Sequence, residues 1–302
     1  MRYSLLSRFQ GALVGMELGE ALEGSCKEGR STSIASPVAR TSLSTWPPRR
    51  LSCSEQQGWG KVAVAIGENI LQSDGRSLHL EPLASVPTTA ATEAGLILAS
   101  LPIVLFLHDD EMRLRQVLSR MLNSGNLGGA LAISFAIAQA LRENLEPLKL
   151  IPQAIAFLEL LSSVPAYPGL VQQLAQVQTA LEQNISLHSI VTDLEPGSPA
   201  DRAVALAFYC FLSSPEDLRL SLLRSTQVAP TQSLSALTGA MSGAYNSTSS
   251  LPLTWRDQGE VQADSMALHQ LGARLWTLWA GALSSDLANT VAIAAPDVIR
   301  SA

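Results

Sequence analysis

Aromatic, charged and sulfur-containing side chains are all scarce in this chain of 302 residues, with aromatics at 5%, charged residues at 15% and only three cysteines. The net charge is −6, and the basic residues are scattered apart from the pair Arg49 and Arg50. No basic patch for a nucleic-acid backbone is therefore expected. Cys26, Cys53 and Cys210 are odd in number and lack metal-type spacing, so we expect reduced thiols and a cytoplasmic protein.

Long hydrophobic runs are missing as well. The most apolar stretch covers residues 95–107 and contains Pro102, whereas a membrane span needs about 20 apolar residues. The apolar N-terminal stretch is interrupted by Glu17 and Glu20 and has no small-residue cleavage site, so no signal peptide is expected. We predict no membrane association.

Alanine and leucine are abundant instead, and apolar residues reach 47% with little alternation of β-branched and polar residues. This pattern predicts an all-α fold, formed as a single globular domain over residues 1–302. An irregular segment rich in Ser, Thr, Pro, Gly and Arg is expected at about 24–60. The helices are expected at residues 5–22, 61–72, 92–107, 111–123, 129–142, 148–161, 169–183, 201–212, about 215–225, 233–246 and 269–283.

Glycine recurs every four residues in the first expected helix, at Gly11, Gly15 and Gly19, and again at Gly239 and Gly243. A glycine inside a helix costs roughly 1 kcal/mol relative to alanine, so each stripe needs a compensating close contact. We predict that the two bare helix faces pack against each other. That packing is compatible with a ligand site at the helix ends.

Four histidines are present, and none lies in a recognisable catalytic motif. His108 stands beside Asp109 and Asp110, a combination that also occurs in metal and acid–base clusters. Adjacent loop residues point in different directions, however, and Asp110 is well placed to cap the helix that follows. We therefore expect ordinary structural roles for these three residues.

Two segments carry a longer pattern. Residues 9–21 read Phe-Gln-Gly-Ala-Leu-Val-Gly-Met-Glu-Leu-Gly-Glu-Ala, and residues 236–244 read Ala-Leu-Thr-Gly-Ala-Met-Ser-Gly-Ala. Together they resemble the ADP-ribosylglycohydrolase family, whose members begin with Phe-x-Gly-x-x-x-Gly-x-x-x-Gly-Asp-Ala and later carry Gly-Asp-Thr-Asp-Thr before a helix Ala-Ile-Thr-Gly-Ala-x-x-Gly-Ala. The resemblance implies an all-helical fold with a cleft where these helices meet. It also implies hydrolysis of the glycosidic bond between ADP-ribose and a protein side chain, with two magnesium ions held by carboxylates and threonine hydroxyls.

The chain departs from the family where those ligands would lie. The two aspartates of the Asp-Thr-Asp-Thr signature fall on Pro230 and Gln232, and its threonines fall on Thr231 and Ser233. Proline has no side-chain oxygen, and glutamine has only a neutral one.

A second ligand motif of the family, Thr-Asp-Asp-Thr, falls on residues 57–60, where Gly58 and Trp59 replace the aspartates. The family's glycine-rich ligand loop falls on residues 93–95. Glu20 occupies the position of the aspartate in the first family motif, and its side chain is one methylene longer.

These substitutions predict that the dinuclear magnesium site is lost, with no metal ligand and no catalytic residue left. A vestigial cleft would keep Gly19, Glu20, Thr231 and Ser233 as weak ligand-binding residues. The favoured hypothesis is a non-catalytic binding or interaction protein, with ADP-ribose or a protein as its partner. The alternatives are an active hydrolase of ADP-ribosyl-protein bonds with an altered site, and an unrelated helical protein that mimics the phrase.

Overall fold

The computed structural model describes residues 3–31, 58–75, 93–122, 124–160, 167–194, 197–228, 233–251 and 259–281. Within these ranges all regular structure is helical, which confirms the all-α prediction. None of the helices in this part of the chain is long and apolar enough to cross a membrane. The α-helices are α1 (Leu5–Ser31), α2 (Trp59–Gln72), α4 (Glu93–Ala99), α5 (Leu101–Phe106), α6 (Glu111–Met121), α7 (Ser124–Leu141), α8 (Leu150–Leu160), α9 (Pro168–Glu182), α10 (Leu187–Asp193), α11 (Pro199–Leu212), α12 (Leu218–Gln227), α13 (Leu234–Asn246) and α15 (Gly259–Trp279), and a short 3-10 turn, η1, covers Thr248–Ser250.

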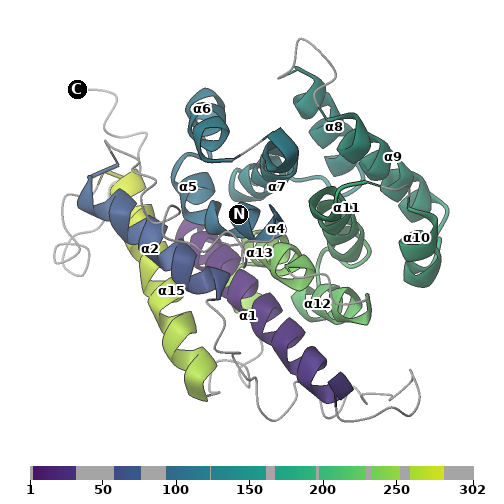
Figure 1. The fold of residues 1–302 in the computed structure, drawn as a ribbon. Helices are drawn as coiled ribbons and strands as arrows, with labels where there is room; N and C mark the ends of the chain where they lie inside the picture. Colours follow the sequence, from purple (N-terminus) through teal and green to yellow (C-terminus); the bar gives the residue numbers. More distant parts are fainter. Residues whose placement is uncertain are drawn as a thin grey trace.

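Helices α1 and α13 form the central pair of the fold and contact each other more extensively than any other two helices. Figure 1 shows α2 and α15 on one side of α1, while α8, α9 and α10 lie at the opposite edge. Helix α11 packs against both α9 and α13, so it joins the outer helices to the centre. Its residues from Ala203 to Phe211 are all buried, as expected for a helix that is apolar on every side.

The two glycine stripes meet, as the sequence predicts. A Cβ on Gly15 would overlap the carbonyl oxygen of Gly239, and one on Gly11 would overlap the carbonyl oxygen of Gly243. At the other end a Cβ on Gly19 would overlap the carbonyl oxygen of Ser235. Because the order of contacts runs in opposite directions along the two chains, the helices are antiparallel and touch backbone to backbone.

Helix α1 is buried on all sides from residue 8 to residue 19. Phe9, Leu13 and Met16 belong to the main hydrophobic core, whereas Val14 and Leu18 face a smaller cluster that includes residues of α12. A helix enclosed in this way has no polar face to give to water, so its polar side chains must find partners inside the protein.

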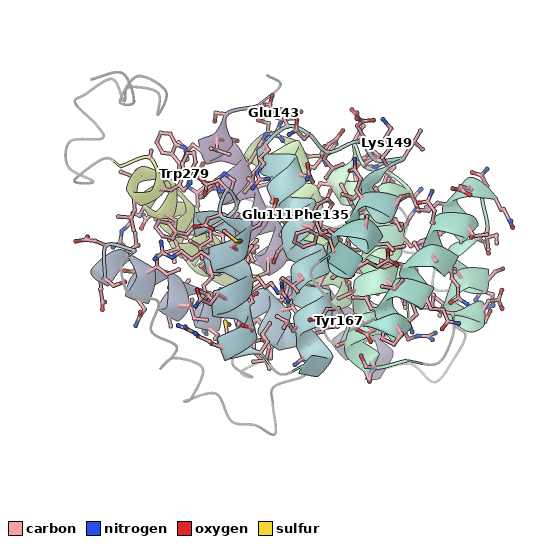
Figure 2. The ribbon with its side chains drawn as sticks, turned by 90° about the horizontal axis from the view of Figure 1, so that it is seen from above. Glu111, Phe135, Glu143, Lys149, Tyr167 and Trp279 are labelled. Carbon is pink, nitrogen blue, oxygen red and sulfur yellow. The ribbon has the colours of Figure 1, made fainter. Side chains whose placement is uncertain are left out.

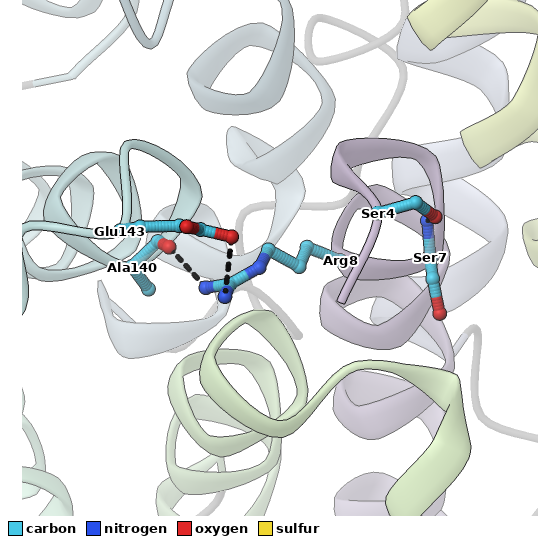
Figure 3. A network of polar contacts seen from close by, with 5 residues as sticks. All are labelled: Ser4, Ser7, Arg8, Ala140 and Glu143. Carbon is cyan, nitrogen blue, oxygen red and sulfur yellow. Dashed lines mark hydrogen bonds and ion pairs between the residues drawn. The ribbon is translucent and has the colours of Figure 1, made fainter. Parts of the chain in front are cut away.

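Arg8 shows how this requirement is met at the start of α1. Its side chain is buried, its guanidinium donates a hydrogen bond to the carbonyl of Ala140, and it pairs with Glu143 at 3.2 Å between Nη2 and Oε1 (Figure 3). Ala140 lies in the last turn of α7, where carbonyl groups lack partners within the helix. Arg8 thus ties the beginning of α1 to the end of α7.

Some expected boundaries were wrong. Helix α1 continues to Ser31, so the first part of the segment expected to be irregular, at about 24–60, is helical; residues 32–57 lie outside the described residues. The chain has no proline before Pro37 that would force the helix to stop. Helix α15 begins at Gly259, ten residues before the expected start.

Other differences arise at short breaks. The helix expected over residues 92–107 is divided into α4 and α5, because Pro102 in the first turn of α5 cannot donate a backbone hydrogen bond. The turn expected at residues 123–126 is instead the start of α7 at Ser124. Helix α10 was not expected at all, and it begins where Ser186 accepts a hydrogen bond from the backbone N–H of Ser189.

The backbone contact between α1 and α13 predicts a strong effect of a single methyl group. Gly15→Ala should lower the free energy of unfolding by about 1–3 kcal/mol because the methyl has no room, even though alanine favours a helix by about 1 kcal/mol. Urea denaturation measures the change. In the matched control Gly169→Ala, the new Cβ would lie 3.8 Å from Asp201 Oδ2, and stability should be unchanged or slightly higher. An equally stable Gly15→Ala protein would contradict the close packing.

Candidate functional site

Glu20 is half-buried on α1, and its carboxylate contacts the start of α2. Oε1 accepts a hydrogen bond from the backbone N–H of Trp59 at 2.8 Å, and Oε2 accepts one from Gly60 at 3.2 Å. Gly58 at the N-cap of α2 has no side chain to do this, and the first turn of α2 contains no acidic residue. Glu20 therefore caps a helix that lacks a cap of its own, and its negative charge is favourable beside the positive end of the helix dipole.

A second carboxylate reaches the same helix start. Glu17, one turn before Glu20 on α1, is buried, and a Cβ on Gly60 would overlap its Oε2. Gly60 is thus the residue that makes room for Glu17. Sequence reasoning missed Glu17, although its spacing of three residues from Glu20 places both side chains on one face of α1.

Trp59 fills the space beside this helix start. Its side chain is 9% exposed, and a Cβ on Gly95 would overlap the indole ring. The ring therefore lies directly against the backbone of α4, at the position where the resemblance puts the ligand loop of the family. Trp59 stands where the resemblance puts an aspartate of the family. Its large apolar side chain lies between α2 and α4.

The start of α13 completes the candidate site. Gly19 contacts the backbone of Ser235, and Ser233, two residues earlier, is the N-cap of α13. Ser233 is 3% exposed and has a φ of 87°, in the left-handed region that costs a non-glycine residue roughly 1–2 kcal/mol. The structure thus brings Gly19 close to the start of α13 and Glu20 close to α2. Pro230, Thr231 and Gln232 lie outside the described residues.

The described residues do not fit a site for two magnesium ions. Magnesium is held by oxygen ligands, usually carboxylates. Gly58, Trp59 and Gly60 supply no side-chain oxygen, and both oxygens of Glu20 accept backbone N–H groups. Across the described ranges, no three His, Cys, Asp or Glu side chains gather closely enough to share a metal ion.

His108, Asp109 and Asp110 do not form a reactive cluster. Asp110 accepts a hydrogen bond from the backbone N–H of Arg113 at 3.0 Å, and so caps α6 as expected. His108 is buried with its Nδ1 2.8 Å from the carbonyl oxygen of Leu105, and its ring lies 4.9 Å from that of Trp279. Burial lowers the pKa of the His108 imidazole below its usual value, so the ring is neutral in the fold at pH 7.

Two hollows lie elsewhere on the molecule. One has a volume of about 450 Å³ and lies beside Tyr209 and Arg224, and the other, of about 350 Å³, lies beside Arg8 and Glu143. Neither is lined by Gly19, Glu20, Trp59 or Ser233. Among the described cysteines, Cys210 is buried, and burial raises the pKa of its thiol to about 12, so it is not a nucleophile at neutral pH.

The comparisons with known proteins agree with the resemblance. The sequence profile of the ADP-ribosylglycohydrolase family matches residues 30–284, most of the chain. The chain belongs to the ADP-ribosylglycohydrolase family. No curated protein matches it in sequence. A solved structure described as an ADP-ribosylglycohydrolase-related protein complex is similar with a TM-score of 0.55 and 17% identity, covering 89% of this chain and 99% of that one. At this identity the likeness shows the fold alone.

Family membership excludes the hypothesis of an unrelated protein that mimics the glycine phrase. The profile match begins at residue 30 and leaves out the first phrase at residues 9–21. The packing supports this first motif instead. Its glycines contact Gly239 and Gly243 of α13, the helix that resembles the second family motif.

The cap at the start of α2 gives a testable effect on stability. Glu20→Ala removes both acceptors and should lower the free energy of unfolding by about 1 kcal/mol, with or without magnesium in the buffer. Glu20→Gln is the matched variant, since it keeps one acceptor oxygen but loses the charge, and it should cost less. Urea titrations of the three proteins measure the difference. Equal stability of wild type and Glu20→Ala would show that Glu20 does not cap α2.

The buried neutral His108 predicts a pH dependence. Because its pKa is lower in the fold than in the unfolded chain, stability is present above the unfolded value of about 6.5 and is lost as pH falls through it. From about pH 7.5 to about pH 5.5, wild type should lose more stability than His108→Gln, by at most about 1.4 kcal/mol per pH unit. The measurement compares urea midpoints at both pH values. Parallel pH profiles of the two proteins would contradict it.

Proposed function

We propose that this chain is a non-catalytic member of the ADP-ribosylglycohydrolase family that keeps the fold to bind ADP-ribose or a protein partner. One observation carries the proposal. At the start of α2, where the resemblance puts two aspartates, the chain has Gly58 and Trp59, and Glu20 occupies the backbone N–H groups. The Glu20 carboxylate serves as a helix cap.

The chemistry of the remaining positions supports the same conclusion. Two adjacent magnesium ions require several charged oxygen ligands. Pro230 and Gln232 replace both aspartates of the Asp-Thr-Asp-Thr signature, and neither side chain carries a charge. The indole of Trp59, packed against Gly95, takes up volume in the part of the fold that the resemblance assigns to ligand binding. We infer that the metal site of the family has been lost.

A binding role remains compatible with this arrangement. Ser233 holds a strained left-handed conformation at the start of α13, and such strain persists chiefly where the surrounding structure enforces it, often at functional sites. The cleft proposed here consists of Gly19, Glu20, Thr231 and Ser233. The scattered basic residues offer no footprint for nucleic acid, and we place the protein in the cytoplasm on its cysteine usage.

The alternative function is hydrolysis of ADP-ribosyl-protein bonds by an altered site. The observation that favours it is the pair Glu17 and Glu20, two carboxylates on one face of α1 that both reach the start of α2. Paired carboxylates at different degrees of burial are a common arrangement for general acid–base catalysis of glycosidic cleavage. The same assay decides between the two functions.

The proposal predicts that the protein releases no ADP-ribose. The full chain is incubated with magnesium and peptides ADP-ribosylated on arginine or serine, and free ADP-ribose is measured by chromatography. The expected signal equals that of a heat-denatured sample. Turnover above this control, abolished in Glu17→Ala or Glu20→Ala, would establish the alternative function instead.

Calorimetric titration then separates the two non-catalytic roles. We expect ADP-ribose to bind with the same affinity with and without magnesium, because no metal takes part. Heat of binding that requires magnesium would contradict the loss of the metal site. A titration without heat at either condition would point to a protein partner rather than a nucleotide.

A further inference from the structure

The hollow beside Tyr209 and Arg224 is separate from the candidate site. It lies where the ends of α9, α11 and α12 meet the start of α10 (Figure 1). Its volume of about 450 Å³ is in the range of small-molecule sites. The hollow also reaches the turn before α8, next to Lys149 at the rim of the molecule in Figure 2. A ligand can therefore enter it from solvent without passing the candidate site.

The walls of the hollow are partly apolar and are held in place. Leu181, Leu187 and Leu212 line it, and each of them is half-buried. Tyr209, also in the wall, is buried and donates its hydroxyl hydrogen to the carbonyl of Ile185 at 2.6 Å. This hydrogen bond ties the loop between α9 and α10 to α11. The hollow is thus preformed, as small-molecule sites usually are.

Arg224 supplies the positive charge in the wall. It is half-buried in the last turn of α12, and its Nη1 donates a hydrogen bond to Ser214 Oγ. Ser221 holds this serine in turn, because its hydroxyl donates to the carbonyl oxygen of Ser214 at 3.0 Å. The guanidinium is therefore positioned by a pair of serines.

The charge of Arg224 is not matched by a carboxylate. None of the ion pairs among the described residues involves Arg224. The negative end of the α12 dipole offsets part of the charge, but a guanidinium has several N–H donors in a planar fork, and Ser214 accepts from only one nitrogen. None of the Arg224 nitrogens is buried without a partner, so the others remain accessible. Such a fork fits the two oxygens of a carboxylate.

A second charge limits which anions fit. Among the described residues that line the hollow, only Arg224 and Glu182 are charged. Glu182 is exposed to solvent and accepts a hydrogen bond from Gln178 Nε2 at 2.6 Å. Burial raises the pKa of the Tyr209 phenol, so this side chain stays neutral. One positive and one negative group leave the lining without net charge, which favours a monoanion over a doubly charged phosphate.

We propose that this hollow binds a small monocarboxylate with an apolar body. The carboxylate accepts hydrogen bonds from the Arg224 guanidinium, and the hydrocarbon part lies against Leu181, Leu187 and Leu212. Removal of the hydrocarbon from water supplies binding energy, while the arginine selects the charged end. The site is independent of ADP-ribose binding and of hydrolysis, so its test does not bear on the proposed function.

Hexanoate is the probe, and its binding to the full chain is measured by ligand-observed NMR titration, which does not depend on the heat of binding. We expect a dissociation constant on the order of 1 mM. Acetate, hexan-1-ol and inorganic phosphate should each bind about tenfold more weakly, because the first two carry only one half of the ligand and the third is doubly charged. Equal affinity for any of the three, or no saturable binding of hexanoate below about 20 mM, would overturn the proposal.

Arginine replacement tests the anchor of the carboxylate. Arg224→Gln should weaken hexanoate binding about tenfold or more, since the fork and its charge are lost. The matched control is Arg219→Gln, which lies on the same helix but does not line the hollow, and it should bind hexanoate like wild type. Unchanged binding in Arg224→Gln would show that the guanidinium does not hold the ligand.

A second pair of variants leaves Arg224 and its serines intact. Leu187→Glu places a carboxylate in the wall at the first residue of α10, where a negative charge suits the helix start but repels the ligand. Leu187→Gln is the neutral control of similar size. Circular dichroism checks that all the variants remain folded. We expect hexanoate to bind Leu187→Glu about tenfold more weakly than Leu187→Gln, and equal affinity would contradict binding in this hollow.

Discussion

The structure depends on the backbone contact between α1 and α13. Three glycines of α1 allow the two helices to approach until their main chains touch, and nothing larger than hydrogen fits at Gly15 or Gly239. This close contact allows α1 to be buried on every side. It also fixes how far α1 and α13 can slide along each other, to within one helical turn. The neighbouring helices pack on α1 and α13, so this pair determines where those helices lie.

That axial position explains the candidate site. Because Gly19 lies against the backbone of Ser235, the last enclosed turn of α1 lies beside the start of α13. Glu20 follows immediately and reaches the start of α2. The starts of α2 and α13 therefore both lie beside the middle of α1. Helix N-termini offer unpaired N–H groups, and two of those of α2, from Trp59 and Gly60, donate to the carboxylate of Glu20 on α1.

The sequence predicted the helical class and the contact of the glycine stripes because both depend on local, periodic features. The spacing of Gly11, Gly15 and Gly19 predicts a close helix partner, and Gly239 and Gly243 carry the same fourfold spacing in a later helix. The capping role of Glu20 was not predictable, since it depends on the start of α2 lying against the middle of α1, a contact between residues about forty positions apart. The extension of α1 to Ser31 was missed because Gly24 and Ser25 are weak helix formers that tertiary context can override.

The residues that stabilise the fold differ from the residues that would bind a metal ion. The two groups also place opposite requirements on the stability of the protein. The glycine contact requires small residues inside two helices, whereas a magnesium site requires several carboxylates brought together at helix ends, where they repel one another in the absence of the ion. The indole of Trp59 carries no charge and is buried against Gly95, and the carboxylate of Glu20 accepts two N–H groups at the start of α2. In the proposed non-catalytic protein, losing the chemistry would thus favour the stability of the fold, which follows the general opposition between stability and activity at functional sites.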